Sequence, residues 1–253
     1  MSEPLLVQAR KFPPTPTGAI TERDAAVLNW LGEVHIADTD SMREAYTYFG
    51  RTPMTKKRLS QRLLQLSRAG QIGSQVLYRG NNRRVYYPVR QPYPIARRDL
   101  AHDLITAHMS ITLLSAGNST RLHHNRDLST EQRTQRNHWT RDVPSNKNAH
   151  VADGLLWLPD HTTVIVEIEL TPKSTRRLSN ILASHANRLR TDGDPAAHIL
   201  YLTTRRVGQV IADAWRNNGH AVDHPHAMQI MHAVDDVSLS TTPGVTTIQI
   251  PDT

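Results

Sequence analysis

Apolar residues recur at helical spacing three times between residues 20 and 70 of this 253-residue chain. The first predicted helix begins at Thr21, a good N-cap with Asp24 three residues on, and its apolar stripe is Ala25, Val27, Leu28, Leu31 and Val34. A second, shorter helix is predicted at Asp40–Phe49, with one face formed by Met42, Ala45, Tyr46 and Phe49. Thr55 caps a third helix that ends at Gly70, and its buried side is Leu59, Leu63, Leu66 and Ala69.

After Gly73 the period of the pattern changes from helical to alternating. Gly80-Asn81-Asn82 is typical of a tight turn between two strands, one around Val76 and the other at Val85–Tyr87. Three helices followed by a hairpin is the element order of a winged helix-turn-helix domain, which residues 20–92 resemble. Residues 1–19 are interpreted as a flexible, proline-containing arm, with DNA contact through Arg10 and Lys11 as the alternative.

Positive charge is concentrated in the first hundred residues. They hold 16 Lys/Arg and 8 Asp/Glu, a formal charge of +8, whereas residues 101–253 hold 14 and 15, a charge of −1. A basic excess confined to one segment favours a polyanionic partner for that segment. The element order narrows this partner to double-stranded DNA, because a helix fits the major groove and a basic hairpin can follow the backbone.

The residues predicted to contact DNA lie on the third helix and on the hairpin tip. On the helix they are Thr55, Lys56, Lys57, Arg58, Ser60, Gln61 and Arg62. On the hairpin they are Arg79, Asn81, Asn82, Arg83 and Arg84. DNA binding of this kind requires no cofactor. The alternative is that these charges form a solvated surface, or that the domain contacts proteins.

Other classes of protein fit the sequence poorly. No apolar run approaches the roughly 18 residues of a membrane helix, and the first residues lack the apolar stretch of a secretory signal. The chain contains no cysteine, which excludes disulfides and thiolate chemistry. We therefore expect a cytoplasmic location in a bacterial host, with no membrane partner and with self-association left open.

A second domain is predicted from residue 96 onward. A helix starts near Asp99, and the polar segment 117–150 is either a second DNA contact or an insertion. Two strands, Gly154–Leu158 and Thr163–Leu170, form a hairpin. A helix at 174–191, a strand at 198–204, a helix at Val207–Asn217 and a weak strand at 245–250 follow. This alternation indicates an α/β domain, so the whole chain is of the α/β (α+β) class.

Three carboxylates are predicted to converge on this hairpin. Glu167 and Glu169 alternate with aliphatic residues and therefore share one face of their strand. Asp153 begins the preceding strand and would lie near Glu167 across the hairpin. Asp153, Glu167 and Glu169 would suit a hard cation such as Mg²⁺ or Mn²⁺. The alternative is a sheet-edge network in which Glu169 pairs with Arg176 or Arg177.

The pattern resembles the PD-(D/E)xK nuclease fold. Asp153 matches the aspartate of that family, with Ala152 in place of its proline, and Glu167 matches the second acid. The lysine position holds Glu169, and the nearest lysine is Lys173. The resemblance implies that, in an active enzyme, Asp153, Glu167 and Lys173 would be catalytic and the two acids would bind the metal ion.

The chain is also similar to the replication-relaxation family of actinobacterial plasmids, phages and integrative elements. The similarity rests on His102-Asp103-Leu104, on the segment from His150 to Gly154, and on the segment from Glu167 to Ser174. It implies a role in plasmid or phage DNA biology. Our leading prediction is a sequence-specific DNA-binding regulator, such as a phage or plasmid repressor, whose nuclease-derived second domain does not cut DNA. The alternatives are a metal-dependent endonuclease or nickase acting in plasmid replication or mobilisation, and an interaction scaffold.

Overall fold

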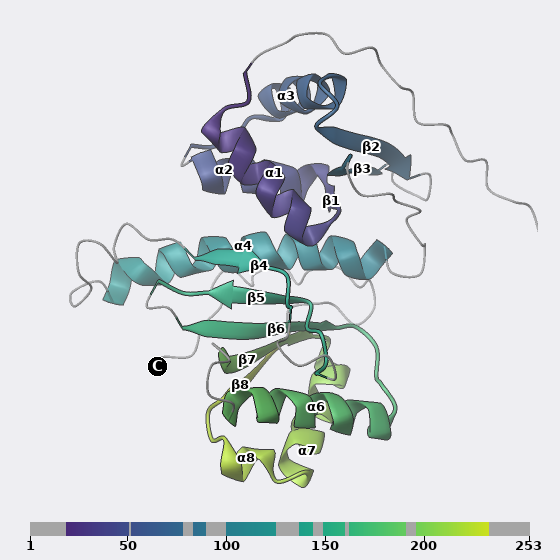
Figure 1. Ribbon diagram of the computed structural model, residues 1–253, viewed down its shortest axis with the longest axis vertical. Coiled ribbons are helices and arrows are strands. Elements are labelled where there is room, and N and C mark those ends of the chain that lie inside the picture. Colours follow the sequence, from purple (N-terminus) through teal and green to yellow (C-terminus); the bar gives the residue numbers. More distant parts are fainter. Residues whose placement is uncertain are drawn as a thin grey trace, which may run out of the picture. The chain divides into compact units, whose positions relative to one another are not determined.

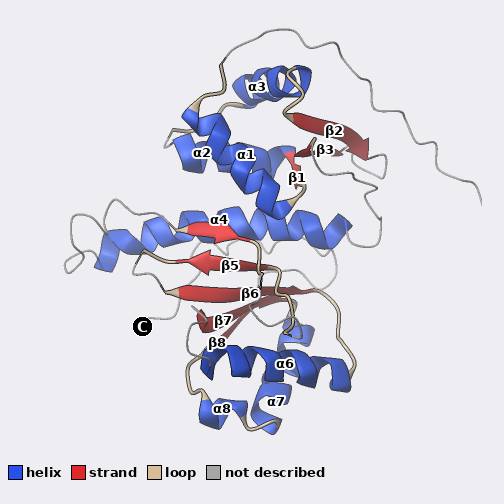
Figure 2. Ribbon diagram, in the orientation of Figure 1, coloured by secondary structure: helices blue, strands red, loops and turns tan. Residues whose placement is uncertain are grey.

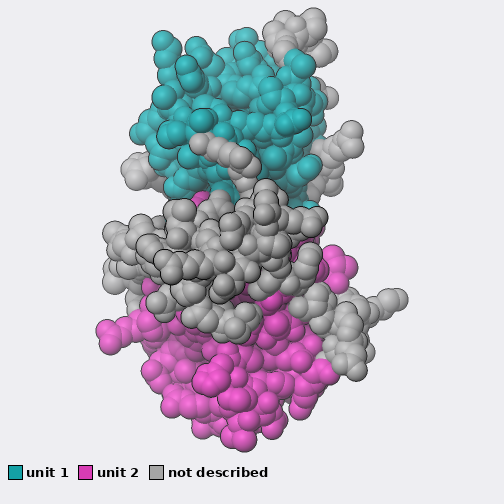
Figure 3. All heavy atoms as spheres, turned by 90° about the vertical axis from the view of Figure 1, so that its left-hand side faces the viewer, with its two compact units in different colours: residues 1–111 teal, residues 112–253 magenta. Residues whose placement is uncertain are grey.

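The computed structural model describes residues 19–50, 52–77, 83–89, 100–124, 137–143, 149–159, 162–190 and 196–232, and only the backbone of residues 117–124. Within these ranges the chain has a mixed α/β fold of seven helices and two sheets, which confirms the predicted class (Figures 1 and 2). It divides into two compact units, residues 1–111 and 112–253 (Figure 3). None of the described helices combines the length and apolarity that crossing a bilayer requires.

The three helices predicted in the first unit are present as α1 (Glu22–Val34), α2 (Thr39–Gly50) and α3 (Lys56–Arg68). Thr21 and Asp24 cap α1 reciprocally, and Gly70 ends α3 with a φ of 69°. The buried stripe of α1 differs from the prediction, because Ala25 is exposed, Leu28 is only partly buried and Trp30 is buried. Leu59, Leu63 and Leu66 form the buried face of α3 as predicted, whereas Ala69 is only partly buried.

A three-stranded antiparallel sheet completes this arrangement. It consists of β1 (Ala37–Asp38), β2 (Ile72–Leu77) and β3 (Arg83–Pro88), in the order β1-β3-β2. The hairpin strands β2 and β3 were predicted, but β1 was not. Two residues are too few to show a period, so β1 becomes a strand only because β3 offers it an unpaired edge.

The long helix α4 (Leu100–His124) contributes to the first unit through its first turns. Leu104 packs with Ile36 and Val85, and the Trp30 indole donates a hydrogen bond to Ser110 Oγ at 3.0 Å. The helix extends further than its apolar pattern indicates, into the polar segment 117–150. The same segment also contains the short strand β4 (His138–Thr140).

The second unit contains a five-stranded mixed sheet in the order β4-β5-β6-β7-β8. Strands β5 (Gly154–Trp157) and β6 (Thr163–Glu169) form the predicted hairpin, antiparallel to each other, and β4 extends it antiparallel to β5. Strands β7 (Ala196–Thr203) and β8 (Met228–His232) run parallel to β6. All residues of β6 are buried, so both faces of this strand are covered.

Helices connect the parallel strands. α6 (Thr175–Arg190) lies between β6 and β7 in the chain, and α7 (Arg205–Asn217) and the short α8 (His220–Asp223) lie between β7 and β8. Apolar residues of α6 and α7 pack against β5, β6 and β7 in one core that includes Leu182, Ile165, Tyr201 and Trp215. Strand β8 was not predicted, and the predicted strand at 245–250 lies outside the described residues.

The approach of Trp139 to Gly154 predicts a steric requirement for glycine. A Cβ atom on Gly154 would come within 2.0 Å of the Trp139 ring, so the ring would have to move. We expect Gly154→Ala to lower the free energy of unfolding by about 1–3 kcal/mol. Gly32→Ala is the control, since its Cβ would meet no heavy atom within 4 Å, and it should stabilise α1 by up to about 1 kcal/mol. Urea unfolding followed by circular dichroism measures both, and equal stability of the two variants would contradict the packing.

Candidate functional site

The first candidate site is the exposed N-terminal part of α3. Thr55 caps the helix by accepting a hydrogen bond from the Arg58 backbone N–H at 3.3 Å. The polar residues of its first turns are all exposed: Thr55, Lys56, Lys57, Arg58, Ser60 and Gln61. Because Leu59, Leu63 and Leu66 anchor the opposite face, α3 presents these side chains to the surroundings without disturbing the core.

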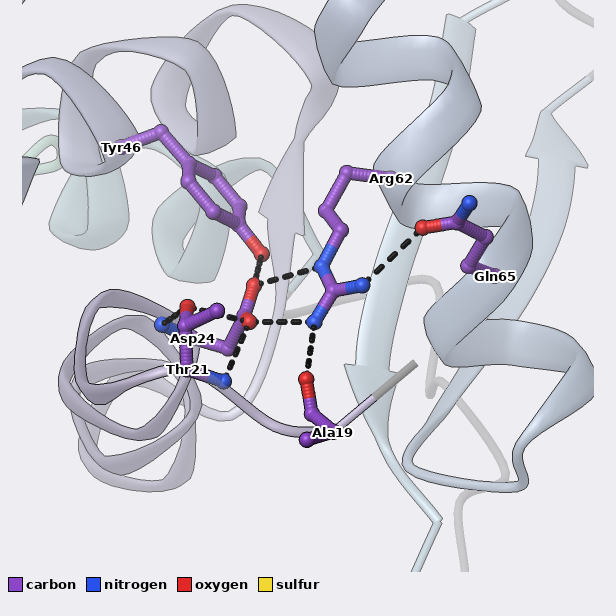
Figure 4. Close-up of polar contacts among 6 residues, drawn as sticks. All are labelled: Ala19, Thr21, Asp24, Tyr46, Arg62 and Gln65. Atoms are coloured by element: carbon purple, nitrogen blue, oxygen red, sulfur yellow. Dashed lines mark hydrogen bonds and ion pairs between the residues drawn. The ribbon is translucent and has the colours of Figure 1, made fainter. Parts of the chain in front are cut away.

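Arg62, predicted to contact DNA, is instead engaged within the fold (Figure 4). Its guanidinium forms an ion pair with Asp24, and Nε donates to Asp24 Oδ1 at 2.9 Å. The remaining donors contact Gln65 Oε1 at 3.0 Å and the Ala19 carbonyl oxygen at 3.2 Å. Only 18% of the Arg62 side chain is exposed. Its donors therefore fasten α3 to the start of α1.

Asp24 accepts hydrogen bonds from several donors although it is 1% exposed. Besides Arg62, the Tyr46 hydroxyl donates to Oδ1 at 2.8 Å and the Thr21 backbone N–H to Oδ2 at 2.8 Å. Burial alone would raise the pKa of Asp24, but the hydrogen bonds from Arg62, Thr21 and Tyr46 outweigh it and hold this pKa well below its usual range. The carboxylate is therefore ionised and joins α1, α2 and α3. We call this group the Asp24 cluster.

Two of the hairpin residues predicted to contact DNA, Arg83 and Arg84, lie in the described part of the chain. Arg83 forms an ion pair with the buried Asp38 while its side chain stays 56% exposed, and Arg84 is exposed. Arg79, Asn81 and Asn82 lie outside the described residues. The exposed basic surface that can be assigned in the first unit therefore consists of the start of α3 and the start of β3.

The second candidate site surrounds Glu167 on the central strand β6. Glu167 Oε1 lies 2.9 Å from His150 Nε2 and 3.0 Å from His185 Nε2. His185 is fully buried on α6, and His150 precedes β5 with its side chain 26% exposed. Burial would raise the pKa of Glu167, but the hydrogen bonds from the two histidines outweigh it and lower this pKa. Glu167 is thus held as a buried carboxylate between two imidazoles.

Hydrogen bonds and an ion pair hold the segment that carries His150 against α6. The His150 backbone N–H donates to Ser184 Oγ at 2.8 Å. The Ala152 N–H donates to Asp142 Oδ2 at 2.8 Å, and the same oxygen pairs with Arg188 at 2.8 Å. Ser184 and Arg188 lie one turn apart on α6, so the position of His150 is set by the same helix that carries His185.

The residues predicted to bind a hard cation are not gathered on one ion position. Asp153 Oδ2 accepts a hydrogen bond from the Ile168 N–H at 2.6 Å, and Glu169 forms an ion pair with Lys173 rather than with the predicted Arg176 or Arg177. Among the described residues, the group whose ligand atoms lie close enough to share an ion is His150, Glu167 and His185, all within 4.8 Å of one another. This group shares only Glu167 with the predicted set of Asp153, Glu167 and Glu169.

Lys173, the proposed substitute for the nuclease lysine, forms its ion pair with Glu169. Burial lowers the pKa of Lys173, while the charges of Glu167 and Asp153 act in the opposite direction. Those same two carboxylates also act on Tyr201, whose pKa is raised first by burial and then by their charges. The ion pair of Lys173 with Glu169 and the hydrogen bond of Asp153 to the Ile168 N–H place both residues beside the end of β6.

His185 was missed from the sequence although a signal was present. It falls on the apolar stripe of α6, three residues after Leu182 and four after Ile181. A histidine at a position where the pattern predicts an aliphatic residue needs a buried polar partner. His150 belongs to the segment that carries the family resemblance, but it was not proposed as a ligand.

No family model, curated protein or solved structure matches this chain.

The Asp24 cluster predicts a strong and pH-dependent contribution to stability. Asp24→Asn removes the charge that balances the largely buried Arg62, and we expect it to lower the free energy of unfolding at pH 7 by about 3 kcal/mol. Because the pKa of Asp24 is lower in the folded chain than in the unfolded chain, this stabilisation is complete above about pH 5 and is lost on acidification. The difference between wild type and Asp24→Asn should therefore narrow from pH 5 to pH 3.

Asp40→Asn is the matched control for this experiment. Asp40 is 67% exposed and pairs with Arg43 at 3.5 Å, so its loss should change the free energy of unfolding by less than about 1 kcal/mol. Urea unfolding at several pH values measures both variants. If Asp24→Asn behaves like Asp40→Asn, the cluster does not hold α3 in place.

Proposed function

We propose that this protein is a sequence-specific DNA-binding regulator of a phage or plasmid, such as a repressor, acting in the bacterial cytoplasm. In this proposal the first unit is a winged helix-turn-helix domain, α3 is its recognition helix and the β2–β3 hairpin is its wing. The observation that carries the proposal is the exposed polar start of α3, which presents cationic and hydrogen-bonding side chains from a helix anchored on its opposite face.

The topology of the first unit supports the winged-helix assignment. Its elements follow the order α1-β1-α2-α3-β2-β3, and β1 joins the hairpin to give a three-stranded sheet. Tight anchoring of α3 also fits a recognition helix, because reading base edges requires side chains held on a rigid element. The Asp24 cluster supplies that rigidity.

Charge distribution supports a polyanionic partner. Exposed Lys56, Lys57 and Arg58 lie in the segment whose formal charge is +8. Each cation that replaces a counterion on the phosphate backbone adds salt-dependent affinity, and Ser60 and Gln61 can hydrogen-bond to base edges. We leave Arg62 out of this surface because Asp24, Gln65 and Ala19 engage its donors.

For the second unit we propose a nuclease-derived domain that supports DNA binding or self-association. The β5–β6 hairpin followed by α6, β7 and α7 is consistent with the α/β core of the PD-(D/E)xK fold. The absence of a lysine two residues after Glu167 argues against catalysis, since Glu169 stands there. Membership of the replication-relaxation family is part of the same proposal.

Removing one charge from α3 tests the proposed DNA surface. We expect Lys57→Ala and Arg58→Ala each to weaken binding to a mixed-sequence duplex and to reduce the slope of log affinity against log salt by about one, if each contacts a phosphate. Arg216→Ala is the control, because Arg216 is 61% exposed but lies on α7. Fluorescence anisotropy over a range of salt concentrations gives the slopes.

Two outcomes would contradict this proposal. One is negligible affinity for duplex DNA in dilute buffer, and the other is equal salt slopes for wild type, Lys57→Ala and Arg58→Ala. Footprinting on the DNA upstream of the protein's own gene then tests sequence specificity. A regulator should protect a defined site, whereas uniform protection would indicate non-specific binding.

A second candidate function is a metal-dependent endonuclease. It is favoured by two contacts at the end of β6, where Asp153 accepts a hydrogen bond from the Ile168 N–H at 2.6 Å and Lys173 forms an ion pair with Glu169. A metal ion there would polarise the scissile phosphate and activate water, while Lys173 would stabilise developing charge.

A plasmid assay separates the two functions. We expect the wild-type protein to bind supercoiled plasmid in the presence of Mg²⁺ or Mn²⁺ without nicking it. Nicking that persists through purification and disappears in Asp153→Ala, but not in the exposed-residue control Asp213→Ala, would establish the endonuclease instead.

A further inference from the structure

We propose that His150, Glu167 and His185 bind one divalent transition-metal ion, with Zn²⁺ as the best match among the common ions. This site goes beyond the proposed DNA binding and differs from the all-carboxylate site predicted from the sequence. Its ligands come from three separate elements: the segment before β5, the strand β6 and the helix α6.

The distances between the ligand atoms fit a shared ion. Glu167 Oε1 lies 2.9 Å from His150 Nε2 and 3.0 Å from His185 Nε2. With metal–ligand bonds of about 2.1 Å, two ligands on one ion lie about 3.0–3.4 Å apart for bond angles between octahedral and tetrahedral values. All three ligand atoms lie within 4.8 Å of one another, so small side-chain rotations suffice to centre them on an ion.

The ligands are already positioned by buried interactions. The His150 backbone is hydrogen-bonded to Ser184, and Ala152 is held through Asp142 and Arg188. Glu167 lies on a strand that is hydrogen-bonded on both edges, and His185 lies on the covered face of α6. A preformed site binds its ion with little loss of conformational entropy.

Tyr201 supplies an independent indication of a bound ligand. It pairs with Glu167 in the parallel register of β6 and β7, so the two side chains leave the sheet on the same face. The centroids of the Tyr201 and His185 rings lie 6.2 Å apart. The Tyr201 hydroxyl is buried and lacks a hydrogen-bond partner within the described part of the chain. An unpaired buried hydroxyl is unfavourable, and a bound ligand that reached it from the Glu167 side of the sheet would give it a partner.

The chemistry of the ligands selects the class of ion. Two imidazole nitrogens and one carboxylate oxygen suit Zn²⁺ and its transition-metal neighbours, whereas Mg²⁺ prefers oxygen ligands in an octahedral arrangement. The Glu167 carboxylate brings a negative charge to the three side chains, which favours a cation. Because 26% of the His150 side chain is exposed, an ion can enter from that side.

Metal analysis of the untagged 253-residue chain tests this proposal without DNA, so its outcome is independent of the proposed function. The protein is stripped with a chelator, incubated with Zn²⁺ or with Mg²⁺, and desalted, and bound metal is measured by mass spectrometry. We expect about one Zn²⁺ per chain, no retained Mg²⁺, and a higher melting temperature with Zn²⁺.

Variants assign the ion to this site. His150→Gln and Glu167→Gln should each lower the Zn²⁺ affinity at least about tenfold and abolish the rise in melting temperature. Because His150 is partly exposed, we expect its substitution to leave the fold intact. Circular dichroism checks the fold of both variants. His226→Asn is the control, since His226 is exposed and has a φ of 69°, which asparagine tolerates.

Three results would overturn the proposal. They are the absence of Zn²⁺ binding by the wild-type chain, unchanged binding by folded His150→Gln, and equal loss of binding in His226→Asn. In each case the three side chains would form a hydrogen-bonded group without an ion.

Discussion

The buried Asp24 carboxylate is the interaction on which the first unit depends. It receives hydrogen bonds from Thr21 at the start of α1, Tyr46 on α2 and Arg62 on α3. A buried charge without partners would be strongly unfavourable, so these three helices stabilise it only in one mutual arrangement. That arrangement turns the leucine face of α3 inward and leaves its polar start exposed. A residue that never reaches the surface thus determines which side chains α3 presents.

Glu167 is a second buried carboxylate, with partners of a different kind. Arg62 is permanently charged and forms an ion pair with Asp24, whereas the partners of Glu167 are the imidazoles of His150 and His185, whose ring nitrogens can also bind a metal ion. The first arrangement is complete without a ligand. The arrangement of His150, Glu167 and His185 favours a cation. For that reason we assign the Asp24 cluster to folding and propose metal binding for these three residues.

Much of the secondary structure could be predicted because it depends on neighbours along the chain. The Thr21–Asp24 cap, the end of α3 at Gly70 and the β5–β6 hairpin follow from local spacing. Strands β1 and β8 were missed, since each depends on pairing with a strand distant in sequence. Arg62 was assigned to the DNA surface because its helical position allows exposure. Its partner Asp24 lies 38 residues away and could not be identified by spacing.

The sequence by itself determined the α/β class, the limits of most helices and strands, the basic character of the first hundred residues and the identity of the polar residues at the start of α3. These properties follow from composition and from apolar patterns that repeat every two or 3.6 residues, and such patterns are local features of the sequence. Only the tertiary structure decided which buried charges meet. His150, Glu167 and His185 come from a loop, a strand and a helix, and their proximity results from strand pairing and helix packing, which no local pattern encodes.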